Sequence, residues 1–159
     1  MPGEFQFNVM KINKLRQRQD LGEDTKVKKA YSQLEKLLEK LSDKDLPDSA
    51  IIPINSDIDE LNAISDSGKE LRKQVKKKET KIVNLLEKEL KLVPKNYYQG
   101  TWMAMGMAAF GVPLGLVFGF ALDNLAFMGI GLSFGLAIGA GMDKKAFEEG
   151  RQLDFEVKY

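Results

Sequence analysis

The most regularly spaced residues in this sequence are six glycines, which form two series with a spacing of four. They are Gly111, Gly115 and Gly119, followed by Gly131, Gly135 and Gly139. Residues four apart lie on one face of a helix. Glycine carries no reactive group, so the chemistry that this spacing offers is close contact between backbones. A glycine inside a water-exposed helix costs about 1 kcal/mol relative to alanine, which favours a role in lipid.

Side chains that could perform catalysis are scarce in the rest of the chain. The sequence contains no Cys and no His, which excludes disulfides, thiolate nucleophiles, Cys/His zinc sites and imidazole acid–base catalysis. It has no recognisable carboxylate pair and no G-x-x-x-x-G-K-[ST] phosphate loop. We therefore expect no enzymatic activity, catalytic residue, metal site or cofactor. Nucleic-acid binding is not expected either, because the net charge is only +1.

The glycines lie in the one long apolar region of the sequence. Over residues 96–142, the only Asp, Glu, Lys or Arg is Asp123. The uncharged stretches 101–121 and 125–142 would reach about 31 Å and about 27 Å as helices, close to the thickness of a bilayer core. The pattern predicts a transmembrane helical hairpin over 97–142.

Residues typical of the membrane–water interface flank the two spans. The predicted interface anchors are Tyr97, Tyr98, Trp102, Lys144 and Lys145. Asp123 and Asn124 are predicted to form the turn between the spans, which contains no Lys or Arg. Because basic residues concentrate on the cytoplasmic side, we expect both termini to face the cytoplasm across the inner (cytoplasmic) membrane.

The two glycine series also predict how the spans pack. Helices in lipid gain little by hiding apolar side chains from each other, whereas small residues let their backbones approach. The two series would face each other within one chain, or each would contact another subunit. Gly106, Gly129 and Gly141 add small residues outside the two series, which favours a second contact surface and a homo-oligomer. Pro113 is expected to bend the first span.

The N-terminal part of the sequence has a polar and helical pattern. Residues 1–23 show no sustained period and are predicted to form an N-terminal arm. Residues 24–96 are predicted to form a cytoplasmic, coiled-coil-like helical domain. Its first helix is predicted over 24–42, where apolar residues at spacings of three and four make one face that comprises Val27, Ala30, Tyr31, Leu34, Leu37, Leu38 and Leu41.

A connector is predicted over 43–55, because Pro47 and Pro53 disfavour a continuous helix. A second, long helix is predicted from Ser56 to Val93. Its heptad seam is interrupted at Gly68, Lys78 and Glu89. The two helices would form an antiparallel hairpin with a small core, which favours self-association. The expected fold class is therefore all-α, with an amphipathic helical hairpin followed by a transmembrane hairpin.

The C-terminal part of the sequence resembles a known class of proteins. The glycine pattern and the ending GLAIGAGMDKKAFEEGRQLDF are similar to the glycine-zipper small bacterial membrane proteins, over about residues 100–155. The resemblance implies tight helix packing and often homo-oligomers, including channels and membrane-active toxins. Residues 143–159 are predicted to be a cytoplasmic tail.

Two functions are consistent with this organisation. The first is a small integral membrane protein that self-associates through its glycine-bearing spans and forms or gates a pore under the control of its cytoplasmic helices. Such a pore would lack a polar lining apart from Ser133 and glycine backbone. The alternative is a membrane anchor or scaffold that presents the cytoplasmic helices to a protein partner. The expected partners are thus the lipid bilayer, further copies of the chain and a cytoplasmic protein.

Overall fold

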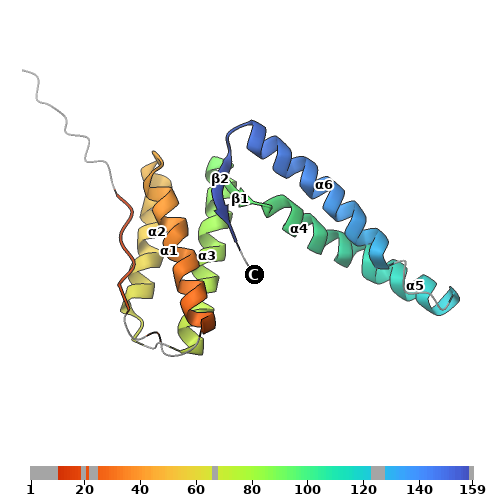
Figure 1. Ribbon diagram of the computed structural model, residues 1–159, viewed down its shortest axis with the longest axis horizontal. Coiled ribbons are helices and arrows are strands. Elements are labelled where there is room, and N and C mark those ends of the chain that lie inside the picture. Colours follow the sequence, from red (N-terminus) through yellow and green to blue (C-terminus); the bar gives the residue numbers. More distant parts are fainter. Residues whose placement is uncertain (1–10, 19–20, 22–24, 66–67, 123–127, 158–159) are drawn as a thin grey trace, which may run out of the picture. The chain divides into compact units, whose positions relative to one another are not determined.

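The chain divides into two compact units, which the computed structural model describes over residues 11–18, 21, 25–65, 68–122 and 128–157. The N-terminal unit is Met1–Leu90 and the C-terminal unit is Lys91–Tyr159. Figure 1 shows the order of their helices and strands along the chain. The unit boundary lies a few residues before the predicted domain boundary at 96–97, because the strand that precedes the first apolar helix belongs to the C-terminal unit.

The N-terminal unit is built from helices α1 (Thr25–Ser42), α2 (Asp48–Ala63) and α3 (Lys69–Leu90). Helices α1 and α2 both pack against α3. The predicted helix over 24–42 is confirmed as α1, and its predicted apolar face is buried in full. The core contains the largest fully buried side chains of the unit, which are Leu34, Leu37, Leu41, Ile54, Ile58, Leu61, Leu71, Ile82 and Leu86.

The predicted connector over 43–55 and the single helix from Ser56 to Val93 are wrong. Helix α2 begins directly after Pro47, whose extended backbone serves as the N-cap, and it contains Pro53. A proline in the second turn removes one helical hydrogen bond. The burial of the apolar face that includes Ile51, Ile54 and Ile58 outweighs that loss. The chain leaves the helix at Ile64 and re-enters one at Lys69, next to Gly68, where the heptad seam is interrupted.

Lys78, a predicted interruption of the seam, is buried and joins α3 to α2. Its Nζ donates a hydrogen bond to Asp57 Oδ1 at 2.7 Å and another to Glu60 Oε2. Lys81 also pairs with Asp57, at 2.8 Å. Burial lowers the pKa of Lys78, but the hydrogen bonds and charges of Asp57 and Glu60 outweigh burial and raise it above its ordinary value. Asp57 is only 2% exposed, so an ion pair replaces an apolar contact at this point of the core.

We predict that Asp57→Ala lowers the free energy of unfolding by about 1–3 kcal/mol, because it removes the buried acceptor of the Lys78 ammonium. Glu60→Ala is the matched control. It removes a partner of the same ammonium, but the Glu60 side chain is 62% exposed, so its loss should cost at most about 1 kcal/mol. Urea denaturation followed by circular dichroism measures both values, and equal losses would contradict the buried pair.

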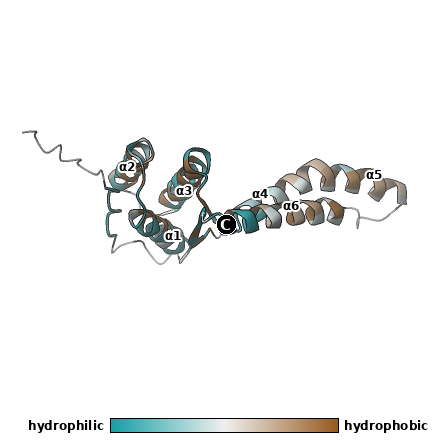
Figure 2. Cartoon of the chain, turned by 90° about the horizontal axis from the view of Figure 1, so that it is seen from above, coloured by the Kyte–Doolittle hydropathy of each residue, from teal (hydrophilic) through white to brown (hydrophobic). Residues whose placement is uncertain are grey.

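The C-terminal unit combines helices with a short parallel sheet. Strand β1 (Val93–Lys95) leads into α4 (Tyr97–Gly106), the π-helical turn η1 (Met107–Gly111) and α5 (Val112–Leu122). Helix α6 (Met128–Glu148) follows and packs against α4, η1 and α5. Strand β2 (Gln152–Glu156) then pairs with β1. Figure 2 shows that α5 and most of α6 are hydrophobic in composition.

The strands differ from the all-α prediction and give structure to the predicted tail over 143–159. Helix α6 continues to Glu148 and is closed by Gly150, whose φ is +69°. The N–H of Arg151 then bonds to Ala146 O at 2.9 Å, which is a Schellman closure. In β2, Leu153 and Phe155 are buried and alternate with exposed residues. The alternation spans too few residues in the sequence to distinguish a strand from an amphipathic turn.

Candidate functional site

The first helix of the C-terminal unit has the dimensions and composition of a membrane span. The helical run Tyr97–Ala121, formed by α4, η1 and most of α5, is long and apolar enough to cross a membrane. Only 17% of its most apolar stretch is buried. Within the described part of the chain, it is the one helix that meets this description. The second predicted span, 125–142, is described only from Met128 onward, as part of α6.

The outward-facing side chains of this helix pair are large and apolar. Phe120 is 89% exposed and Val117 is 63% exposed on α5, and Phe134 is 62% exposed on α6. An apolar surface of this extent is uncommon on a protein surrounded by water and marks a membrane or protein contact. The predicted turn residues Asp123 and Asn124 lie outside the described residues.

Helix α6 turns its predicted glycine series toward the backbone of the first helix. A Cβ built on Gly131, Gly135 or Gly139 would lie closer than 3.0 Å to main-chain atoms there. Those neighbours are, in turn, Gly106 and Gly111, Trp102 and Met103, and Tyr98 and Gln99. The two backbones therefore approach closely enough that no side chain fits between them at these three positions.

On the first helix, the described contact includes Gly111 of the predicted series and extends from it toward the N-terminus. Gly106, which is outside the two glycine series, lies against Gly131 together with Gly111. Gly115 is buried and Gly119 is half-buried. The main-chain atoms that lie against the α6 glycines belong to α4 and η1. Some of them belong to residues other than glycine, because only the main chain of these residues takes part.

The π turn explains why Gly106 and Gly111 reach the same neighbour. Residues five apart point about 140° away from each other on a regular α-helix. In η1, the N–H of Val112 bonds to Met107 O, five residues earlier, which widens the turn and brings both glycines to the buried side. Pro113 supplies a cause, because its ring conflicts with the carbonyl four residues earlier in a regular helix. The structure thus has a local change of helical register next to Pro113, whereas the bend expected there stays a prediction.

Asp143 continues the α6 series of Gly131, Gly135 and Gly139 by one further step of four. Its Oδ1 accepts the N–H of Tyr98 at 3.1 Å, and its Oδ2 accepts the N–H of Gln99 at 2.9 Å. These donors are at the second and third positions of α4, where a local capping side chain would normally bond. The residue at the start of α4, Asn96, makes no such side-chain bond. Asp143 is only 7% exposed. It is a residue of α6 that serves as the N-terminal cap of α4.

In the sequence, Asp143 marks the end of the apolar region. The signal that could have identified it is its place in the series G-x-x-x-G-x-x-x-G-x-x-x-D, which sets it on the glycine face of α6. An acidic residue on that face must meet the partner helix. The positively polarised N-terminus of α4 is an electrostatically favourable neighbour.

The Asp143 contact also brings the predicted interface anchors to one end of the helix pair. Tyr97 and Tyr98 are at the start of α4, where their rings pack edge to face at 5.2 Å. Lys144 and Lys145 follow Asp143 on α6, are exposed, and pair with Glu148 and Glu149 at 3.8 Å and 3.9 Å. Trp102 is half-buried one turn further along α4.

A second face of α6 also carries small residues, and it is open. Gly129 and Gly141 have no atom within 4 Å of a built Cβ. A shallow hollow of about 460 Å³ lies between them and is lined by Gly129, Ile130, Ser133, Phe134 and Ala137. The Ser133 hydroxyl donates to Gly129 O of its own helix at 3.0 Å. The hydroxyl group of Ser133 is therefore bonded within its own helix.

The described residues contain no group of three or more His, Cys, Asp or Glu side chains arranged to hold a metal ion. Comparisons with protein-family models, with curated proteins and with solved structures find no match for this chain. The apolar helix pair, closed by backbone contact and by Asp143, is accordingly the candidate functional site that the geometry itself provides.

We predict that Gly135→Ala destabilises the helix pair by about 1–3 kcal/mol, because the added methyl group would meet the main chain of α4. Gly141→Ala on the same helix is the matched control. It gives the same gain in helix propensity, and its methyl group enters open space. Thermal unfolding in detergent, followed by circular dichroism, compares the two variants. A Gly135→Ala chain as stable as the Gly141→Ala chain would contradict the close backbone contact.

We predict that Asp143→Ala costs about 0.5–2 kcal/mol, the usual range for loss of a helix N-cap. Hydrogen exchange provides a specific measurement, because the amide protons of Tyr98 and Gln99 should lose protection. Asp143→Asn keeps an acceptor oxygen and should retain part of this protection, and Lys144→Ala should leave both amides unchanged. Unaltered exchange in the Asp143→Ala chain would show that α4 is capped in some other way.

Proposed function

We propose that this protein is a membrane anchor that holds its N-terminal helical unit at the cytoplasmic face of the inner membrane, for binding to a protein partner. In this proposal α4–α5 and α6 insert as a hairpin, with Asp123 and Asn124 at the outer turn. The observation that carries it is the exposed apolar surface of Tyr97–Ala121, which has no Asp, Glu, Lys or Arg. Lipid is a favourable solvent for such a surface.

The internal closure of the helix pair supports an anchor over a pore. The glycine series of α6 meets the first helix of the same chain, so it is not available to line or assemble a channel. The hydroxyl of Ser133 bonds to its own helix, and the outward-facing side chains are apolar. A conducting pore needs groups that replace the hydration shell of an ion. An anchor has no such requirement.

Self-association remains part of the proposal through the second face of α6. The small residues Gly129, Ser133, Ala137 and Gly141 recur at a spacing of four, and the hollow beside them would admit the backbone of another helix. A second copy of the chain would therefore pack on this face. The pairing would bring two N-terminal units to the same site on the membrane.

Membrane insertion is tested by placing charge on the exposed face of α5. A lysine at the centre of a span disfavours insertion by about 2.5–3.5 kcal/mol. In the variant Leu116→Lys/Val117→Lys, each lysine lies between the centre and the end of the run Tyr97–Ala121 and should cost up to this amount. We expect the wild-type chain to resist carbonate extraction and to float with vesicles, and the variant to lose both properties. Ile52→Lys is the control, because Ile52 is an exposed apolar residue of α2 and its change should leave the membrane fraction unchanged. A soluble wild-type chain would refute the anchor.

Exchange of residues 97–142 for an unrelated transmembrane hairpin separates an anchor from a pore. An anchor should keep its membrane location and its partner binding after the exchange. Vesicles with a potential-sensitive dye provide the second measurement, and we expect no depolarisation by either chain. Depolarisation by the wild-type chain alone would contradict the anchor proposal in favour of a pore.

A further inference from the structure

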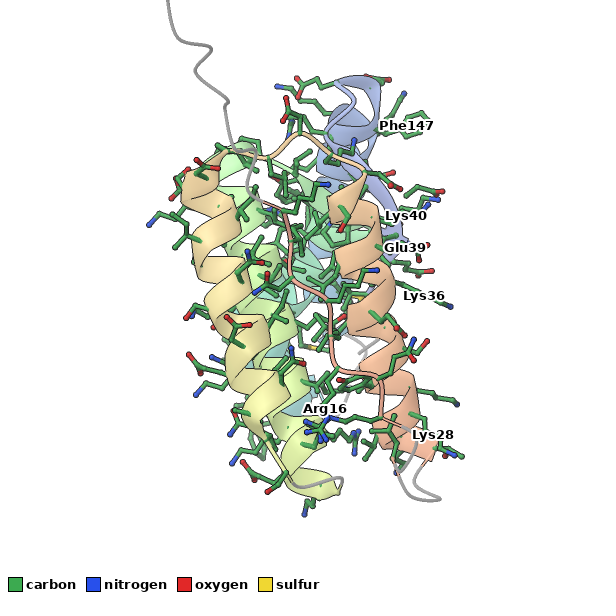
Figure 3. The ribbon with its side chains drawn as sticks, turned by 90° about the vertical axis from the view of Figure 1, so that its left-hand side faces the viewer. Arg16, Lys28, Lys36, Glu39, Lys40 and Phe147 are labelled. Carbon is green, nitrogen blue, oxygen red and sulfur yellow. The ribbon has the colours of Figure 1, made fainter. Side chains whose placement is uncertain are left out.

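Residues 11–18, with the sequence KINKLRQR, run as an extended segment across the N-terminal helical unit. Figure 3 shows this segment passing between α1 and α2. It belongs to the predicted N-terminal arm, which shows no sustained period in the sequence, yet Leu15 is only 8% exposed. We call residues 11–18 the arm segment. Because it forms no strand, its main-chain groups need partners other than a sheet neighbour.

Two asparagines of α2 bind the main chain of the arm segment in the same way. Asn55 accepts the N–H of Asn13 at 2.7 Å and donates to Lys11 O at 2.9 Å. Asn62 accepts the N–H of Arg16 at 2.7 Å and donates to Lys14 O at 3.1 Å. Each amide therefore bonds the N–H of one residue and the carbonyl two residues earlier. We call Asn55 and Asn62 the asparagine ladder.

The spacing of the asparagine ladder matches an extended chain. Seven residues of α-helix cover about 10.5 Å. The bound N–H groups, on Asn13 and Arg16, are three residues apart, which corresponds to about 9–10 Å of extended or polyproline-type chain. Because the amide groups contact only main-chain atoms, this part of the recognition does not depend on the sequence of the bound segment.

Three side chains of the arm segment add a sequence preference. Asn13 Nδ2 donates a hydrogen bond to Asp59 Oδ1 at 3.0 Å. Leu15 is the buried apolar contact. The guanidinium of Arg18 donates to Leu61 O at 2.9 Å and to Ile64 O at 2.5 Å, at the C-terminal end of α2, where the helix dipole favours a cation. It also lies 5.9 Å from the centre of the Tyr31 ring. The arm segment holds four Lys or Arg residues and no Asp or Glu. Lys11, Lys14 and Arg16 are exposed, so the preference for a basic segment rests on the acceptors that bind Arg18.

The arm segment leaves part of the space between α1 and α2 unfilled. An open hollow of about 710 Å³ lies beside it, lined by Ile12, Leu15, Gln17, Ser32, Lys36 and Glu39 among others. Lys36 and Glu39 belong to α1, so this helix forms one side of the hollow. An occupant with larger side chains than those of the arm segment would thus have room against α1.

We propose that the groove between α1 and α2 is a binding site for an extended basic segment of a partner protein, whose main chain the asparagine ladder binds in place of residues 11–18. The arm segment is then an internal occupant that competes with the partner. The proposal specifies the class of protein that the N-terminal helical unit binds. The location of this binding at a membrane rests on the proposed function as a membrane anchor.

Competition between the arm segment and a partner peptide should weaken the apparent affinity of the peptide. A tethered occupant acts at an effective concentration of about millimolar for a short linker. A free peptide must therefore compete with the arm segment for the asparagine ladder. Weakening the arm segment should strengthen the binding of a peptide in trans by at least about tenfold.

The test uses the full chain in detergent and a fluorescent peptide with the sequence KINKLRQR. Fluorescence anisotropy should show at least about tenfold tighter binding to the Leu15→Asp/Arg18→Asp chain than to the wild-type chain. Adding Asn55→Ala and Asn62→Ala should remove this binding, whereas adding Ser56→Ala, an exposed neighbour on α2, should not. A peptide that is N-methylated at the amides matching Asn13 and Arg16 keeps its side chains and should fail to bind.

A second chain keeps the test decisive if the arm variant does not fold. A protease site inserted between Leu21 and Gly22 frees the arm after cleavage of an otherwise unchanged chain, and peptide binding should then rise in the same way. Absence of binding to this cleaved chain would overturn the proposal. So would binding that persists after Asn55→Ala and Asn62→Ala. Because the measurement is made in detergent, it succeeds or fails independently of membrane insertion.

A second copy of the chain is the competing occupant, through exchange of arm segments. Chains with Gln17→Cys are mixed with chains with Ser32→Cys, two positions that line the same hollow. The wild-type sequence has no Cys, so a disulfide between chains reports exchange directly. We expect no such disulfide, and its formation would overturn the assignment to a foreign partner.

Discussion

The close approach of two backbones in the C-terminal unit is the contact on which the rest of that unit depends. Three glycines of α6 allow it, and main-chain atoms of α4 and η1 fill the space that side chains would occupy. Asp143 continues the same face and accepts hydrogen bonds from the N–H groups of Tyr98 and Gln99 at the start of α4. The contact therefore sets the spacing of the helices, and the carboxylate sets their register along the axis.

Polar side chains perform a comparable role in the N-terminal helical unit. Asp57 and Lys78 join α2 to α3 through a buried ion pair, while Asn55 and Asn62 join α2 to the arm segment. Helix α2 is thus an organising element with an apolar face, a charged contact and a face for main-chain recognition. The proposed partner binding makes use of the last of these.

Local patterns predicted much of the fold but placed several boundaries wrongly. The period of α1 was unambiguous, because apolar residues recur along the whole helix. Pro53 suggested a connector where the structure has a helix, since burial of the α2 isoleucines outweighs one lost hydrogen bond. Gly68 lies where one predicted helix divides into two. Of the candidate site, the sequence indicated the α6 glycines, but not Gly106 or Asp143 as contacts.

The sequence by itself determined that a long apolar helix lies within Tyr97–Ala121, because composition and length decide which segments can cross a membrane. It also determined that α6 carries a glycine face, since a spacing of four has a fixed meaning on a helix. Only the tertiary structure decided that this face meets the first helix of the same chain. The π turn at η1 brings Gly106 and Gly111 to one side, and no local spacing rule anticipates a change of register. Likewise, the pairing of Asn55 and Asn62 with residues 11–18 joins distant parts of the chain, and such a contact leaves no periodic signal in the sequence.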